Sequence, residues 1–137
     1  MNGKLNEACK KQHEAIVKKG FTGQSIATKL MLIVSELSEA LEADRKNKHA
    51  DLSAFESAKP ELHAPVINGR MRIPNVIKEE CKLVFEAHIK DTFEDELADA
   101  FLRLMDLCGE YNIDIEKHIR LKAAYNELRP HKHGKAY

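Results

Sequence analysis

The chain has 137 residues, and its 22 basic and 22 acidic side chains leave no net charge. This balance gives no overall field that would attract a nucleic-acid polymer or a membrane surface. Three scattered cysteines without a CxxC pair indicate a reducing compartment and no structural zinc. With no signal-peptide core and no run of about 20 apolar residues, we expect one soluble, cytoplasmic domain over residues 1–137.

Apolar residues recur at the helical period along nearly the whole chain. The first predicted helix ends at Gly20, a plausible residue for the turn that closes it. The second runs from about Gly23 to Lys46. The apolar face of the first comprises Leu5, Ala8, Cys9, Gln12 and Ile16, and the core stripe of the second comprises Leu30, Ile33, Val34, Leu37 and Leu41.

A long connection follows at about residues 47–75. It contains three of the four prolines and one short predicted helix near Asp51–Ser57. Connections of this length in a domain are more often functional or mobile than neutral, so a lid or an interface arm are both open interpretations.

Three further helices are predicted after the connection. Asn75 can cap the first, Thr92 with Asp95 forms a capping box that opens the second, and Asp114 caps the last. The second fades at Gly109, and the last ends by Arg129 because Pro130 disfavours the helical conformation before it. Their apolar faces are Val76, Ile77, Cys81, Val84 and Ile89, and then Phe93, Leu97, Phe101, Leu104 and Cys108. The fold class is therefore all-α, a bundle of four to five helices.

Two stretches share a pattern of paired acids. "SELSEALEAD" places Glu36 and Glu39 on one flank of the second helix, and "EDELADAFLRL" places Glu96 and Asp99 at the same offsets. If similar faces pack together, four carboxylates gather at one spot, where a bound cation or protonation must relieve their repulsion. All-oxygen ligation suits a hard ion, Mg²⁺ or Mn²⁺.

The same acids allow two other interpretations. They could be ordinary surface acids, and Arg103 stands four residues after Asp99 in the orientation that favours an ion pair. A di-iron centre would need Glu-x-x-His pairs, and no glutamate of the chain has a histidine three residues on.

The C-terminal segment "LKAAYNELRPHKHGKAY" carries a polar helical face. Its members can bind phosphate oxygens through Lys and Arg, and a sugar or base through the ring and the amide. Alone, the segment is equally typical of a solvated helix with a frayed tail. The predicted substrate-binding residues are Lys122, Tyr125, Asn126 and Arg129, with His133 and Lys135 in the tail.

Together these motifs resemble the MazG-like, all-α nucleoside triphosphate pyrophosphohydrolases. The resemblance rests on "SELSEALEADRK", on "IKDTFEDELADAFLRLMDLCGEYNIDIEKHI" and on "KAAYNELRPHKHGKAY", from about Thr22 to the end. It implies cleavage of a ribo- or deoxyribonucleoside triphosphate between the α and β phosphates, with Mg²⁺ at Glu36, Glu39, Glu96 and Asp99. It also implies a homodimer or homotetramer.

One position departs from the family pattern, which often has a further acid directly before the first glutamate. This chain has Ser35 there. Glu36 or Glu39 is the expected catalytic carboxylate that orients the attacking water, while Asp95 and Glu42 remain possible substitutes for the missing acid. The alternative function is a helical nucleotide-binding or oligomerisation module without catalysis.

Overall fold

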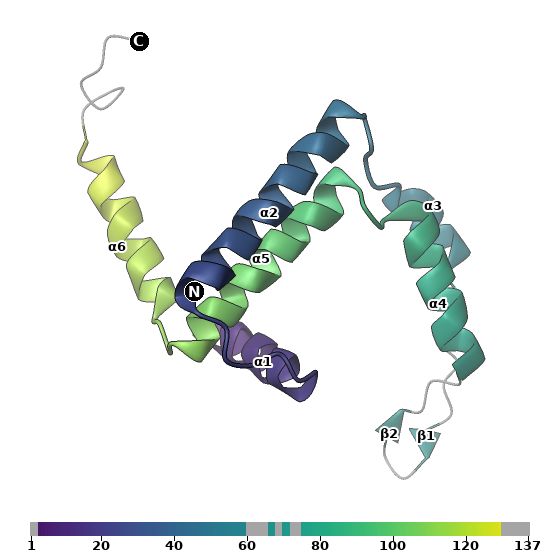
Figure 1. Cartoon of the computed structure of the whole chain (residues 1–137), viewed down its shortest axis with the longest axis horizontal. Helices are drawn as coiled ribbons and strands as arrows, with labels where there is room; N and C mark the ends of the chain where they lie inside the picture. The colour runs from purple at the N-terminus through teal and green to yellow at the C-terminus, as the bar shows by residue number, and fades with distance from the viewer. Residues whose placement is uncertain (1–2, 60–65, 68–69, 72–74, 130–137) are drawn as a thin grey trace. The chain divides into compact units, whose positions relative to one another are not determined.

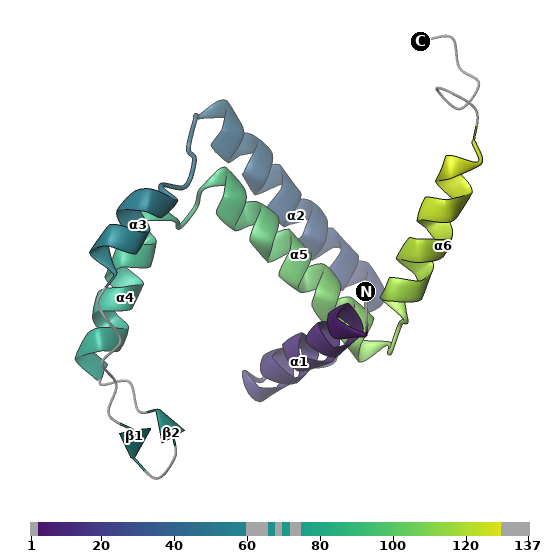
Figure 2. The ribbon, with the colours of Figure 1, turned by 180° about the vertical axis from the view of Figure 1, so that it is seen from behind.

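The computed structural model describes residues 3–59, 66–67, 70–71 and 75–129. Within these residues it has six α-helices and one short β-hairpin (Figures 1 and 2). The elements in chain order are α1 (Lys4–Lys18), α2 (Ile26–Arg45), α3 (Leu52–Ala58), β1 (Val66–Ile67), β2 (Arg70–Met71), α4 (Asn75–His88), α5 (Phe93–Glu110) and α6 (Ile115–Glu127).

The predicted all-α class is confirmed. The short helix predicted near Asp51–Ser57 is present as α3, and with it the described residues form six helices. The hairpin, whose two-residue strands pair antiparallel within the connection, was not predicted. None of the described helices combines the length and the apolar character needed to cross a bilayer.

Several helix ends form as their sequences predict. Gly20 follows α1 with a φ of 88°, in the left-handed region that favours glycine. Asp51 caps α3 by accepting a hydrogen bond from the Ala54 amide at 2.8 Å. Asp114 caps α6 through the Lys117 amide at 3.2 Å.

Two predicted helix ends differ from the structure. α4 begins at Asn75 itself rather than after it. α5 continues through Gly109 to Glu110. A Cβ at Gly109 would come within 2.2 Å of the Cys9 carbonyl oxygen, so this glycine allows α1 to approach α5 rather than ending the helix.

The chain divides into two units. The first comprises the described residues up to Met31 and from Phe101 onward, and the second comprises Leu32–Ala100. In the first, α1 packs against α6. Asn6 connects the two helices, since its amide donates to Asp114 Oδ1 at 2.7 Å and accepts from the Glu116 amide at 3.3 Å.

In the second unit, α3 packs against α4. The rings of Phe55 and Phe85 meet edge to face with centroids 6.4 Å apart. The Asp51 amide donates to the His88 carbonyl at 3.0 Å, and the Phe93 amide donates to the Lys48 carbonyl at 2.9 Å. The connection after α2 is thereby fixed to both ends of the turn between α4 and α5.

In the part of the chain that the structure describes, the predicted core stripe of α2 remains largely exposed. Leu37 and Leu41 remain 48% and 51% exposed, and Leu97 of α5 remains 40% exposed. Small and acidic residues point inward instead, namely Ala40, Ala43, Ala100, Glu36 and Glu96. Helical periodicity identifies an apolar face, but it does not say whether the same chain covers that face.

Candidate functional site

The structure brings the paired acids of the second unit together. Glu36 and Glu39 project from α2, and Glu96 projects from α5. One carboxylate oxygen from each lies within 4.8 Å of the others. Asp99 lines the same pocket, which has a volume of about 410 Å³. The two flanks therefore face each other, as the repeated spacing predicts.

Burial differs among these four acids. Glu36 and Glu96 are only 8% and 7% exposed, whereas Glu39 and Asp99 are exposed. Of these four carboxylates, two are therefore desolvated and two remain in contact with water. A desolvated carboxylate disfavours its charged form unless a cation or hydrogen-bond donors compensate.

Desolvation has a large effect on the pKa of Glu96. Burial raises the pKa of its carboxyl to about 7, and the negative charges of Glu39 and Glu36 act in the same direction. At neutral pH this carboxyl is therefore partly protonated. A divalent cation can displace that proton and relieve the repulsion at the same time.

The donor set fits a hard cation. The acids contribute carboxylate oxygens, and neither a thiolate nor an imidazole lines the pocket among the described residues. Such a set suits Mg²⁺ or Mn²⁺ better than a soft metal.

Several polar groups around the three clustered carboxylates already have partners. The Ser35 hydroxyl donates to Glu39 Oε1 at 3.4 Å, so this side chain contacts the cluster. Asp95 also lines the pocket, but its Oδ2 accepts the Asp91 amide hydrogen at 3.0 Å. Glu42 pairs with Lys46 at 3.1 Å. Among Glu36, Glu39 and Glu96, whose carboxylates converge, Glu39 is the exposed member.

The pocket has a further wall that the sequence interpretation missed. Lys82, Phe85 and Glu86 of α4 line it, together with Lys90 and Asp91 in the turn before α5. Lys82, Phe85 and Glu86 stand at i, i+3 and i+4, and this spacing indicates that the three share one face of α4. Which face α4 turns toward the acids depends on its packing against α3, and that packing is not visible in the spacing.

The predicted substrate-binding residues lie on or after α6, in the first unit. Lys122 and Tyr125 contact each other, with the ammonium 5.0 Å from the ring centroid. The helix ends at Glu127, so Arg129 lies beyond it, and its amide donates to the Asn126 carbonyl at 3.1 Å. The continuous helical face predicted through Arg129 therefore stops at Asn126. His133 and Lys135 lie outside the described residues.

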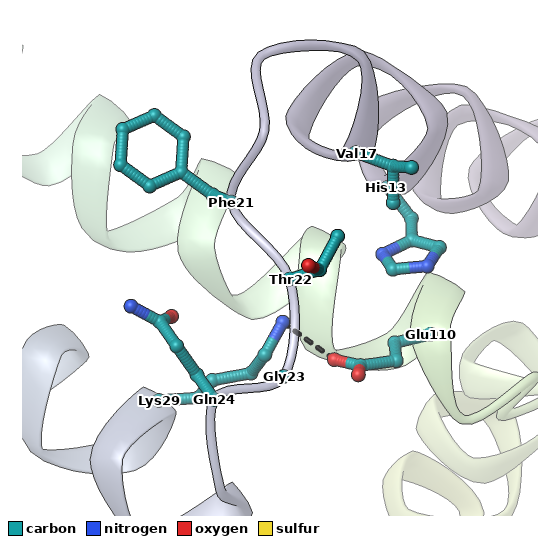
Figure 3. A pocket seen from close by; sticks show the side chains of 8 residues that line it. All are labelled: His13, Val17, Phe21, Thr22, Gly23, Gln24, Lys29 and Glu110. Carbon is teal, nitrogen blue, oxygen red and sulfur yellow. Dashed lines mark ion pairs between the residues drawn. The ribbon is translucent and has the colours of Figure 1, made fainter.

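The first unit contains a second group of charged side chains, which the sequence interpretation also missed. His13 of α1, Lys29 of α2 and Glu110 of α5 line a pocket of about 220 Å³ (Figure 3). Figure 3 shows Lys29 and Glu110 directed toward each other beside the loop that carries Thr22.

Lys29 occupies the centre of this group. Its Nζ lies 2.6 Å from Asp106 Oδ2, and it lies 2.5 Å from Glu110 Oε2 in an ion-pair contact without hydrogen-bond alignment. His13 Nδ1 lies 2.8 Å from the other oxygen of Asp106. Carboxylate and imidazole groups of His13, Asp106 and Glu110 also lie within 4.8 Å of one another. The ammonium already supplies the positive charge that a metal would bring.

The pKa values of Lys29 and Asp106 agree with a structural role for this ion pair. Burial alone would lower the pKa of Lys29, but its contacts with Asp106 and Glu110 outweigh burial and raise it. Burial alone would raise the pKa of Asp106, but Lys29 and His13 outweigh it and lower it. Both groups are therefore held in their charged forms, as expected for a structural ion pair.

A comparison of the chain with protein-family models, with curated proteins and with solved structures finds no match. The function of the acidic pocket must therefore be inferred from its own residues and from the motifs that contain them.

Proposed function

We propose that this protein is a Mg²⁺-dependent nucleoside triphosphate pyrophosphohydrolase. The reaction converts a (d)NTP and water into the monophosphate and pyrophosphate. The observation that carries the proposal is the convergence of Glu36, Glu39 and Glu96 within 4.8 Å, with Asp99 in the same pocket. The nucleotide and the bond cleaved come from the resemblance of the motifs to MazG-like enzymes.

The four acids would hold Mg²⁺, and Mn²⁺ also fits the oxygen donors. A bound ion would supply electrostatic stabilisation of phosphate oxygens and a more acidic water. Glu39 is the better candidate for orienting the attacking water, because it is exposed whereas Glu36 is buried. The Ser35 hydroxyl, 3.4 Å from Glu39 Oε1, would hold that carboxylate in position.

Residues of α6 and its C-terminal end are proposed to contact the substrate. Lys122 and Arg129 would neutralise the departing pyrophosphate, and Tyr125 and Asn126 would contact the sugar or the base. These roles, and those of His133 and Lys135, derive from the resemblance.

The exposed apolar residues support the proposed homo-oligomer. Val34, Leu37 and Leu41 follow one another at helical spacing on α2, and each is about half exposed. An apolar stripe of this kind is typical of a surface that a partner covers, and the resemblance makes that partner a second copy, in a dimer or a tetramer. Light scattering should give a multiple of 15.6 kDa, and Leu37→Glu should shift the mass toward the monomer.

A non-catalytic nucleotide-binding module remains the second candidate. The observation that favours it is Ser35, which stands where the family often has an acid. Such a module would bind nucleotides without releasing pyrophosphate.

Pyrophosphate release from a panel of ribo- and deoxynucleoside triphosphates, with Mg²⁺ and with chelator, distinguishes the two candidates. Mg²⁺-dependent release with a monophosphate product is expected, and the ranking across the panel would identify the base and sugar. Nucleotide binding without release from any member of the panel would favour the module.

A further inference from the structure

Two lysines line the acidic pocket of the second unit. Lys82 lies on α4, and Lys90 lies two residues after the end of this helix. Lys82, Phe85 and Glu86 share one face of α4 because they stand at i, i+3 and i+4. The pocket therefore combines ammonium groups with the carboxylates that gather at Glu96.

Contacts of the connection hold α4 in this position. Phe85, which itself lines the pocket, meets Phe55 of α3 edge to face. The Asp51 amide bonds the last residue of α4, His88, at 3.0 Å. Lys82 thus lies on a helix that is held by contacts with Asp51 and Phe55, and Lys90 lies in the turn that follows this helix.

Carboxylates outnumber ammonium groups among the described residues that line the pocket. Two ammonium groups, of Lys82 and Lys90, stand beside seven carboxylates, from Glu36, Glu39, Glu86, Asp91, Asp95, Glu96 and Asp99. Despite this excess, Lys90 approaches Asp91 only to 3.9 Å. In the part of the chain that the structure describes, no ion pair is formed by Lys82. Both ammonium groups therefore keep hydrogen-bond donors that the acids do not use.

A ligand that satisfies both kinds of group carries a divalent cation and several anionic oxygens. We propose that Lys82 and Lys90 bind phosphate oxygens of a metal–triphosphate chain whose cation is held by the acids. The ligand class is a magnesium-bound polyphosphate, and the inference rests on the proposed function for the nucleotide attached to it. Lysine suits this role because its compact ammonium offers three donors to phosphate oxygens.

Isothermal titration with two probes tests the assignment. The first probe is Mg²⁺ alone, and the second is inorganic tripolyphosphate in saturating Mg²⁺. Lys82→Gln and Lys90→Gln should each weaken tripolyphosphate binding by about 5- to 20-fold, because each removes one charge-assisted contact. The same variants should leave Mg²⁺ affinity unchanged or raise it slightly, because a repelling positive charge is lost.

The affinities for the two probes should change in different ways in the lysine variants, and this difference distinguishes a binding role of the lysines from a structural one. A misfolded pocket would lose affinity for both probes. Lys78→Gln is the matched control, since Lys78 is an exposed lysine of α4 that does not line the pocket. Lys82→Arg should recover most of the binding because it restores the positive charge.

The inference and the proposed function fail in different ways. Weak tripolyphosphate binding by the unaltered protein, or equal binding by the Gln variants, would overturn the lysine assignment. Nucleotide cleavage with an unchanged KM in both variants would also overturn it while leaving the pyrophosphohydrolase intact. Tripolyphosphate binding that depends on both lysines, without cleavage of any nucleotide, would support the lysine assignment and reject the enzyme.

Discussion

Two clusters of charged side chains on α2 and α5 differ in composition: one is built around a buried lysine, and the other gathers several carboxylates. In the first unit, Lys29 contacts both Asp106 and Glu110 at 2.6 and 2.5 Å. In the second unit, Glu36, Glu39 and Glu96 bring three carboxylates within 4.8 Å. Lys82 and Lys90 line the pocket there, and Lys90 approaches Asp91 to 3.9 Å.

The pKa values show the consequence. The pKa of Asp106 is lowered although burial opposes this, because Lys29 and His13 stabilise its charge. The pKa of Glu96 is raised to about 7, because burial and the neighbouring acids both disfavour its charge. In the first cluster, Lys29 compensates the acidic charges, as expected for a cluster that stabilises the fold. In the second, the carboxylates repel one another, and a bound cation can relieve this repulsion, which is typical of a binding site.

Removing the internal cation should have the largest effect. Lys29→Met leaves Asp106 and Glu110 without their buried partner, and we expect the free energy of unfolding to fall by about 3–5 kcal/mol. Chemical denaturation measures this loss. Lys46→Met is the control, because Lys46 and its partner Glu42 are both more than half exposed and such a pair contributes at most about 1 kcal/mol. Equal losses in the two variants would contradict the assignment of Lys29.

Removing one acid of the second cluster should affect activity rather than folding. We expect Asp99→Asn or Glu39→Gln to lower Mg²⁺-dependent pyrophosphate release by about 100-fold or more. Glu80→Gln, a change at an exposed acid of α4 outside the pocket, should keep full activity. A folded Asp99→Asn protein with unaltered release would refute the metal site.

The two clusters also differ in how far the sequence predicts them. The acids of the second repeat one spacing on two helices, so helical geometry placed each pair on one flank of its helix, and the sequence predicted their meeting on the condition that similar faces pack together. The members of the first stand at positions 13, 29, 106 and 110 on three helices. Only tertiary packing brings them together, and no local pattern marks them. The α4 wall of the acidic pocket was missed for the same reason.

The helices themselves were predicted well because their signals are local. Asp51, Asp114 and Gly20 form the turns and caps that their residue types favour. The burial of the apolar stripe of α2 was predicted wrongly. An apolar face has the same sequence pattern whether its own chain or another molecule covers it. Gly109 was also misinterpreted, since its close approach to Cys9 is a long-range contact.

Neutralising Glu96 should stabilise the protein in the absence of metal. Glu96→Gln removes a buried charge that Glu39 and Glu36 repel, and we expect a gain of about 1–2 kcal/mol at pH 8 in chelator. The same change should abolish the rise in melting temperature that Mg²⁺ gives the unaltered protein. Thermal unfolding with and without Mg²⁺ measures both effects. A loss of stability in chelator would show that the charged form of Glu96 has a partner that stabilises it.

The smallest effect, about 1 kcal/mol, should be the pH dependence of stability between pH 6 and 8. The folded pKa of Glu96, about 7, exceeds its ordinary value of 4.5, so its contribution is complete below pH 4.5 and is lost as pH rises through 7. In chelator, the melting temperature should therefore fall between pH 6 and 8, and this fall should be absent in Glu96→Gln. Asp106 has a lowered pKa, so its contribution is retained above its ordinary value of 3.8 and does not change in this range. Mg²⁺ bound at the acids, as proposed, would compete with the Glu96 proton, so its stabilising effect should grow over the same interval. An identical pH profile in the unaltered protein and in Glu96→Gln would mean that the acidic cluster holds no displaceable proton.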